Sequence, residues 1–302
     1  MSFLLPILNT SLRLVEKPYL EAATDVLAVR QSFERKARLL FRSPSGSDFR
    51  KKTVGGRPSV LVTPRAVGSS KVAIFYLHGG AYLFGSPDTH RAMVARLCAE
   101  GGFQALLPSY RLAPEHLFPG ALEDALSAYQ AWRAEHAHVV IGGDSAGGGL
   151  ALALLAEIGR LDLDAPLGAF AFSALTDMTG TAPSLRNNAE TEVILPAHRM
   201  REIGNMYLGG SDPSDPRASP LFADFHGAPP VWLTVSDAEI LLSDSQNLAS
   251  RLTDQNVPVH LRVEHNLPHV WPIFQSYLPE ARATLADLAS WIRQLEERVG
   301  DS

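Results

Sequence analysis

Short apolar segments rich in Val, Ile, Leu and Phe recur along the chain, with more polar segments between them. Between most of these segments, and after the last, apolar residues are spaced three and four positions apart, which is typical of amphipathic helices. This alternation predicts a mostly parallel sheet with helices on both faces. The segments that we predict as strands are residues 59–64, 72–77, 103–108, 138–143, 167–174, 230–236 and 257–264.

Two segments do not follow the alternation. Residues 1 to about 48 have helical spacing and no strand pattern, and residues 176–228 are rich in Pro, Asn, Asp and Gly around one predicted helix near 195–210. Because ligands of open α/β sheets bind beyond the carboxyl ends of the strands, such an insertion is well placed to cover the site. A long surface excursion without a role is the alternative. We predict N-terminal cap helices (1–45), a cap insertion (176–219) and a catalytic domain made of 46–175 and 220–302.

The residues from Gly143 to Gly147 read Gly-Asp-Ser-Ala-Gly and lie between a predicted buried strand and a predicted helix. This is the setting of a nucleophile elbow, in which a sharp turn exposes the serine hydroxyl. The residues two before and two after Ser145 must be small, because their side chains would otherwise collide across the turn. Ser145 is therefore the candidate nucleophile. The alternative is a glycine-rich turn that only packs.

The loop after the strand 72–77 reads HGGAYLFGS and supplies candidate donors for an oxyanion. The backbone N–H groups of Gly79 and Gly80, with that of Ala146 behind the serine, can converge on the oxygen of a tetrahedral intermediate. His78 precedes the glycines, and this place suits a residue that holds the loop by hydrogen bonds better than it suits a base.

Together these motifs resemble those of the hormone-sensitive-lipase-like esterases of the α/β-hydrolase superfamily. The resemblance implies an α/β-hydrolase fold with a mostly parallel eight-stranded sheet and a helical cap. It also implies a carboxylic-ester hydrolase with a Ser-His-acid triad, no cofactor and no metal ion. Ala81 stands where the family usually has a third glycine, which narrows the expected acyl pocket slightly. The resemblance runs from about residue 45 to 298 and includes HGGAYLFGS (78–86), YRLAPEHLFPGALEDA (110–125), GDSAGG (143–148) and PHVW (268–271).

A triad in the chain order serine, acid, histidine needs a histidine after the last strand. The segment HNLPHVWPIF offers His265 and His269. Their spacing also suits two metal ligands on a helix, but Pro268 between them disfavours a helix, and no third ligand is near in the sequence. By resemblance, the histidine of the Pro-His motif is the base. We therefore expect His269 in this role, with His265 as the alternative.

The acid is expected just after the strand 230–236, at the same sheet edge as the serine and the histidine. The segment VSDAEILLSD offers Asp237, Glu239 and Asp244. Relatives usually carry an aspartate nine residues after the second proline of a Pro-Pro pair, and this count from Pro230 reaches Glu239. Asp237 ends the strand itself, and Asp244 fits the first turn of the next helix, where a negative charge is favourable. Glu239 is the expected acid and Asp237 the first alternative.

Composition and charge exclude several other classes of protein. The 302 residues contain 27 Lys and Arg against 32 Asp and Glu, and no basic block is present to bind nucleic acid. No apolar run reaches the about 18 residues of a transmembrane helix, and the first residues lack the pattern of a signal peptide. The single cysteine, Cys98, lies in a helical pattern and suits core packing in a reducing compartment. We expect a cytoplasmic protein without a membrane span, with a homodimer as one option.

The sequence therefore predicts a serine carboxylesterase that hydrolyses short- to medium-chain esters through an acyl-enzyme intermediate. Its partner is a small-molecule ester rather than a nucleic acid. Two alternatives stay open: a non-catalytic ligand-binding homologue, and a lactone or amide hydrolase. The presence of both Ser145 and His269 favours an enzyme over a binding protein. A cap of the predicted size favours short or medium acyl chains, although no residue fixes their length.

Overall fold

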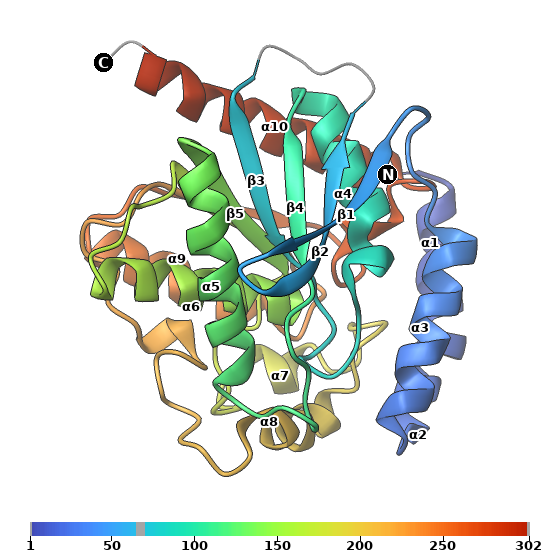
Figure 1. Cartoon of the computed structure of the whole chain (residues 1–302). Coiled ribbons are helices and arrows are strands. Elements are labelled where there is room, and N and C mark those ends of the chain that lie inside the picture. Colours follow the sequence, from blue (N-terminus) through green and yellow to red (C-terminus); the bar gives the residue numbers. More distant parts are fainter. Residues whose placement is uncertain (1, 65–69, 301–302) are drawn as a thin grey trace.

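Figure 1 shows the computed structural model of the chain, which describes residues 2–64 and 70–300. The described residues form one sheet from β1 (Asp48–Val54), β2 (Arg57–Thr63), β3 (Val72–Leu77), β4 (Gln104–Pro108), β5 (His138–Asp144), β6 (Gly168–Phe172), β7 (Val231–Ser236) and β8 (Val259–Glu264). The strand order is β1-β2-β4-β3-β5-β6-β7-β8. β2 is antiparallel to both of its neighbours, β1 and β4. In this order, the strands from β4 to β8 run parallel to one another. The predicted mostly parallel eight-stranded sheet is confirmed.

Seven of the eight strands match the predicted segments, with ends displaced by no more than two residues. β1 is the exception, because the apolar pattern does not mark it. It lies at the edge of the sheet and pairs with β2 alone, so its side chains are mostly exposed or half-buried. Arg50, Lys51 and Lys52 follow one another in this strand, and such charges are common on edge strands, where they discourage pairing with other molecules.

Side chains of the central strand β3 alternate between two apolar cores. Val72, Ile74 and Tyr76 belong to one core, and Ala73 and Phe75 belong to the other. This period of two is the one that a strand buried on both faces requires. The first core is completed by α4 (Pro87–Gly101) and α10 (Pro279–Gly300), and the second by α5 (Gly120–Glu135), α6 (Ser145–Arg160) and α9 (Leu242–Asp254).

Two further groups of helices lie beside the sheet. α1 (Leu4–Ser11), a π-helical turn (Leu12–Glu16), α2 (Lys17–Ala22) and α3 (Val26–Leu40) precede the first strand, and α7 (Ser184–Asn187) and α8 (Met200–Leu208) lie between β6 and β7. The single helix predicted near 195–210 is therefore confirmed as α8. In Figure 1 the helices α1–α3 stand together at one side of the sheet, and α7 and α8 lie beyond one end of the strands. The division into a cap and a catalytic domain stays a prediction.

The N-terminal helices and the insertion contact each other directly. The Arg199 guanidinium donates hydrogen bonds to the carbonyl oxygens of Leu20 and Ala23, at the end of α2. Lys17, at the start of α2, donates to the carbonyl oxygens of Ala189 and Glu192. Within residues 2–64 and 70–300, no helix combines the length and the apolar character needed to cross a membrane.

Candidate active site

The turn between β5 and α6 carries Ser145 in a constrained backbone conformation. The residue has φ of 53°, in the left-handed region that non-glycine residues seldom adopt. A Cβ on Gly143 would lie 2.3 Å from the carbonyl oxygen of Gly147, and one on Gly147 would lie 2.2 Å from that of His78. The collisions that the sequence predicts across a nucleophile elbow are therefore real, and glycine avoids them on both sides of the serine.

Three predicted residues from three strand ends form one chain of hydrogen bonds. Ser145 Oγ lies 2.9 Å from Nε2 of His269, and Nδ1 of the same ring lies 2.6 Å from Oε2 of Glu239. The second oxygen of Glu239 accepts hydrogen bonds from the hydroxyl of Ser173 and the N–H of Ser236, both at 2.8 Å. The Glu239 side chain is thus held on both oxygens, and the residue is 1% exposed.

The charge of Glu239 adjusts the acid–base behaviour of His269. Burial disfavours the charged imidazolium, but the hydrogen bond and charge of Glu239, with the charge of Glu192, raise the pKa of His269 above its ordinary value. A carboxylate in this position stabilises the imidazolium that forms when the ring takes up a proton. The arrangement can therefore accept a proton from Ser145.

The two alternative residues pair with each other at the surface instead. His265 Nδ1 lies 2.6 Å from Oδ2 of Asp237, and their side chains are 74% and 43% exposed. Asp237 also accepts the N–H of Asn266 at 2.8 Å. Burial works against the charge of Asp237, but the bonds from Asn266 and His265 lower its pKa below the ordinary value. Neither His265 nor Asp237 belongs to the hydrogen-bond chain that contains Ser145.

Asp244 lies in the first turn of α9, as predicted. Its buried Oδ1 accepts the backbone N–H groups of Thr176 and Asp177, at 2.9 and 3.0 Å, where the insertion leaves the sheet. Burial raises the pKa of Asp244 to about 7. The side chain thus fastens the start of the insertion to α9.

This raised pKa predicts a pH-dependent component of stability. The folded state holds the Asp244 proton up to about pH 7, whereas the unfolded chain releases it near the ordinary pKa of 3.8. This component is therefore fully present below pH 3.8 and is lost as the pH rises to about 7. Asp244→Asn keeps an acceptor oxygen for Thr176 and Asp177 but removes the proton. Urea unfolding across this pH range should show a flatter pH dependence for the variant, and equal slopes for both proteins would contradict the assignment.

One predicted oxyanion donor is engaged elsewhere. The N–H of Gly79 donates to Oδ1 of Asp144 at 3.0 Å, so it does not point to a substrate oxygen. This hydrogen bond conflicts with the prediction for Gly79. Gly80 and Ala81 line the cavity beside the serine, and Ala81 occupies the third place of the motif, where a backbone N–H donor does not require glycine. The N–H groups of Gly80, Ala81 and Ala146 are the candidates that fit.

His78 is buried and is held among neighbouring polar groups. Burial lowers its pKa to about 3, so the ring is neutral. The His78 ring stacks on the Tyr110 ring, with 4.3 Å between the ring centroids. Its Nδ1 lies 2.9 Å from the carbonyl oxygen of Gly79. The Tyr110 hydroxyl donates to the carbonyl oxygen of His78. These contacts agree with the predicted structural role of His78 in the loop.

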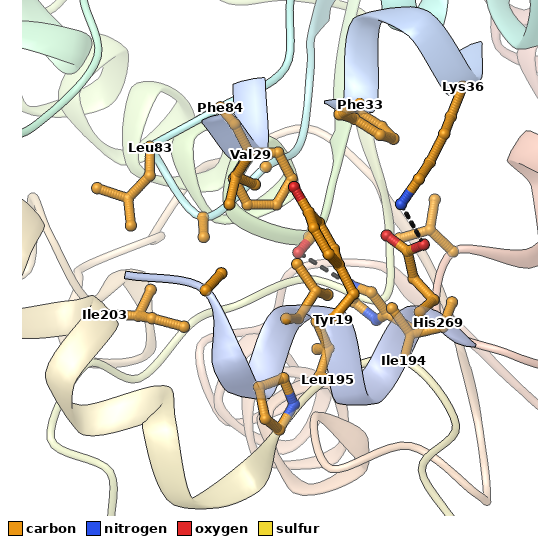
Figure 2. Close-up of a pocket in the computed structure, with 18 of the residues that line it drawn as sticks. Tyr19, Val29, Phe33, Lys36, Leu83, Phe84, Ile194, Leu195, Ile203 and His269 are labelled. Carbon is orange, nitrogen blue, oxygen red and sulfur yellow. Dashed lines mark hydrogen bonds and ion pairs between the residues drawn. The ribbon is translucent and has the colours of Figure 1, made fainter. Parts of the chain in front are cut away.

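A cavity of about 220 Å³ lies above Ser145, between the N-terminal helices and the insertion. Most of its lining is apolar, and Figure 2 shows Val29, Phe33 and Leu195 among the side chains around it. An ion pair of the N-terminal helices interrupts this apolar wall: Lys36 Nζ lies 2.5 Å from Oε2 of Glu16. Both partners come from the N-terminal helices, whereas Leu195 belongs to the insertion. Each of the two non-sheet segments therefore contributes to the cavity.

A second buried carboxyl beside the triad has no counterpart in the sequence prediction. Glu192 belongs to the insertion and is 1% exposed. One carboxylate oxygen of Glu192, one of Glu239 and one ring nitrogen of His269 lie within 4.8 Å of one another. No motif marks Glu192, because the segment around it has neither strand nor helix periodicity.

Comparison with known proteins identifies the family. Residues 74–273 match the family model of the alpha/beta hydrolase fold. The chain belongs to the α/β-hydrolase family. An esterase from the bacterial hormone-sensitive lipase family is 31% identical over 98% of this chain. The chain is therefore one of the hormone-sensitive-lipase-like esterases, which confirms the resemblance stated from its motifs.

The relatives of this α/β hydrolase match it over most of their length. An esterase of Acinetobacter venetianus strain RAG-1 is 34% identical over 236 residues, which make up 77% of this chain and 78% of that protein. The crystal structure of EstE5 has a TM-score of 0.92 and 32% identity, covering 98% of this chain and 99% of that one. An esterase from the bacterial hormone-sensitive lipase family has a TM-score of 0.91 and 31% identity, with the same coverage. The structural similarity to these esterases thus includes the N-terminal helices and the insertion as well as the sheet.

Proposed function

We propose that this α/β hydrolase is a serine carboxylesterase. Ser145 attacks the carbonyl carbon of the ester while His269 takes the hydroxyl proton, and Glu239 holds the imidazole and offsets its charge. His269 then gives the proton to the leaving alcohol. In the second half of the reaction it activates a water that hydrolyses the acyl-enzyme and releases the carboxylic acid.

The observation that carries the proposal is the continuous hydrogen-bond chain from Ser145 through His269 to Glu239 at an apolar cavity. The backbone N–H groups of Gly80 and Ala81, with that of Ala146, are proposed to stabilise the oxyanion of the tetrahedral intermediate. The esterase from Acinetobacter venetianus supports the same class of reaction. A ligand-binding homologue would not need a serine, a histidine and an acid in this order and geometry.

The cavity supports short- to medium-chain esters as substrates. Its volume of about 220 Å³ is below the roughly 300–1,000 Å³ of pockets that hold drug-sized ligands. Each methylene of the acyl chain that is buried against the apolar wall stabilises the bound state by about 0.8 kcal/mol. This raises kcat/KM roughly fourfold per methylene while the chain still fits in the cavity. A longer chain must leave the cavity or displace its wall.

Hydrolysis of nitrophenyl esters from acetate to palmitate tests this proposal. We expect kcat/KM to rise over the short chains, by up to about fourfold per methylene, and to fall towards palmitate. A maximum at palmitate would contradict the assigned chain length. Binding without hydrolysis of any ester would favour the ligand-binding homologue. Activity confined to lactones or amides would favour a lactone or amide hydrolase.

We also propose that the enzyme works in the cytoplasm. The support is its single cysteine, Cys98, which is buried in the core. Burial raises the pKa of this thiol far above its ordinary value, so it is unreactive. A homodimer stays a prediction.

A further inference from the structure

The loop that carries Glu239 is held by side chains of the insertion. This acid loop comprises residues 237–240, in the connection between β7 and α9. Each of its carbonyl oxygens accepts a hydrogen bond from a side chain of the segment 184–191. The bonds run from Asn188 to Asp237 (2.8 Å) and Glu239 (2.7 Å), from Thr191 to Ala238 (3.0 Å) and from Ser184 to Ile240 (2.6 Å).

Glu192 connects the same acid loop to the wall of the cavity. Its Oε2 accepts the N–H of Ile240 at 3.4 Å, directly after Glu239. Its Oε1 accepts the N–H groups of Ile194 and Leu195, at 2.8 and 3.3 Å. Ile194 and Leu195 both line the cavity, as does His269, and Figure 2 labels all three among the lining side chains. The buried Glu192 carboxyl is thus hydrogen-bonded both to the acid loop and to two residues of the cavity wall.

Two titratable groups of other elements lie beside the Glu192 carboxyl: Glu239, which follows β7, and His269, which follows β8. Lys17 of α2 donates to the backbone carbonyl oxygen of Glu192 at 2.8 Å. Burial raises the pKa of Glu192, the charge of Glu239 raises it further, and the charge of His269 opposes both effects. The His269 ring in turn faces Glu239, Glu192 and Asp144, which all raise its pKa.

We propose that Asn188 and Glu192 are positioning residues of the triad, and that Glu239 is aligned with His269 only while the insertion is docked on the acid loop. Asn188 holds two carbonyl oxygens of the acid loop, those of Asp237 and Glu239. Glu192 connects that loop to the cavity wall through its hydrogen bonds. The inference rests on the proposed function, since it assigns Glu239 to the triad. A displacement of about 1 Å in a catalytic group can cost roughly a hundredfold in rate, so a loosened loop should lower kcat.

Asn188 is tested with Asn188→Asp, which keeps the size but removes the two donated hydrogen bonds, and with Asn188→Ala. The matched control is Asn187→Ala, in the exposed neighbouring residue. We expect the Asn188 variants to lower kcat by about ten- to a hundredfold, with KM changed less than about twofold. Asn188 does not line the cavity, so substrate binding should survive. A kcat equal to that of the control would overturn the role of Asn188.

Glu192 is tested with Glu192→Gln, which keeps the shape of the side chain and removes its charge. Loss of that charge lowers the pKa of the His269 imidazolium, so the acid limb of the pH profile of kcat/KM should move to lower pH. A unit charge at 4.8 Å shifts such a pKa by at least about half a unit, even in bulk water. The exposed Glu190→Gln is the matched control, and an acid limb that coincides with it would overturn the role of Glu192.

Two further measurements separate positioning from folding and from the proposed function. Thermal unfolding reports structural damage, which alone would lower the melting temperature without moving the acid limb. If Asn188→Ala does not fold, Asn188→Asp and Glu192→Gln decide the question. A wild-type protein that hydrolyses no ester defeats the proposed function itself. A wild-type enzyme that is active and depends on Ser145, with both positioning variants equal to their controls, defeats this inference alone.

Discussion

Ser145→Ala is expected to abolish ester hydrolysis while the fold is retained. Alanine fits the crowded turn between Gly143 and Gly147, but it offers no nucleophile to the carbonyl carbon. In enzymes with such a triad, loss of the serine costs on the order of a millionfold in kcat. The measurement is kcat on nitrophenyl butyrate, with circular dichroism to verify the fold. Ser290→Ala, in an exposed residue of α10, is the matched control and should behave as wild type.

The size of any residual rate distinguishes the alternatives. Substrate binding, together with oxyanion stabilisation by the proposed donors Gly80, Ala81 and Ala146, would leave a small background rate without the nucleophile. A variant that keeps more than about 1% of the wild-type kcat is inconsistent with an acyl-enzyme formed on Ser145. That result would require another nucleophile or direct attack by water.

Glu239→Gln is expected to lower kcat by about a hundred- to ten-thousandfold. The change removes the negative charge opposite His269 Nδ1 and permits the wrong tautomer of the ring. Because this charge raises the pKa of His269, the acid limb of the residual activity should move to lower pH. Glu239→Asp keeps the charge but withdraws it by one methylene, so its rate should fall between wild type and Glu239→Gln.

Asp237→Asn is the control for Glu239→Gln. Asp237 pairs with exposed His265, so its loss should change kcat by only a few fold. Steady-state kinetics from about pH 5 to 9 on the three variants gives kcat and the acid limb of its pH profile. A crippled Asp237→Asn beside a nearly normal Glu239→Gln would contradict the assigned acid.

The sheet was largely predictable because buried parallel strands leave a strong signal. Val72 to Leu77 form an unbroken apolar run, since both faces of β3 are buried. β1 left no such signal, because consecutive charges such as Arg50 and Lys51 conceal its alternation. Whether such a segment becomes an edge strand depends on the neighbouring strand that it pairs with. This information does not lie in the sequence of the segment itself.

The site was predictable where chemistry depends on local spacing. The glycines around Ser145 and the count from Pro230 to Glu239 both lie within short segments. The prediction for Gly79 conflicts with the hydrogen bond that its N–H donates to Asp144, 65 residues away in the chain. Glu192 was missed for the same reason, since its bond to Ile240 spans 48 residues. Contacts of this kind arise from the folded chain and leave no periodicity to detect.

Covalent labelling tests most directly the central claim that Ser145 forms the acyl-enzyme. The protein is treated with diethyl p-nitrophenyl phosphate, which traps activated serines, and its peptides are mapped by mass spectrometry while residual esterase activity is followed. The account predicts one adduct per chain, located on Ser145, that forms in step with the loss of activity and is absent from Ser145→Ala. Complete inactivation with the adduct on another residue, or sustained hydrolysis by a chain fully modified at Ser145, would contradict it.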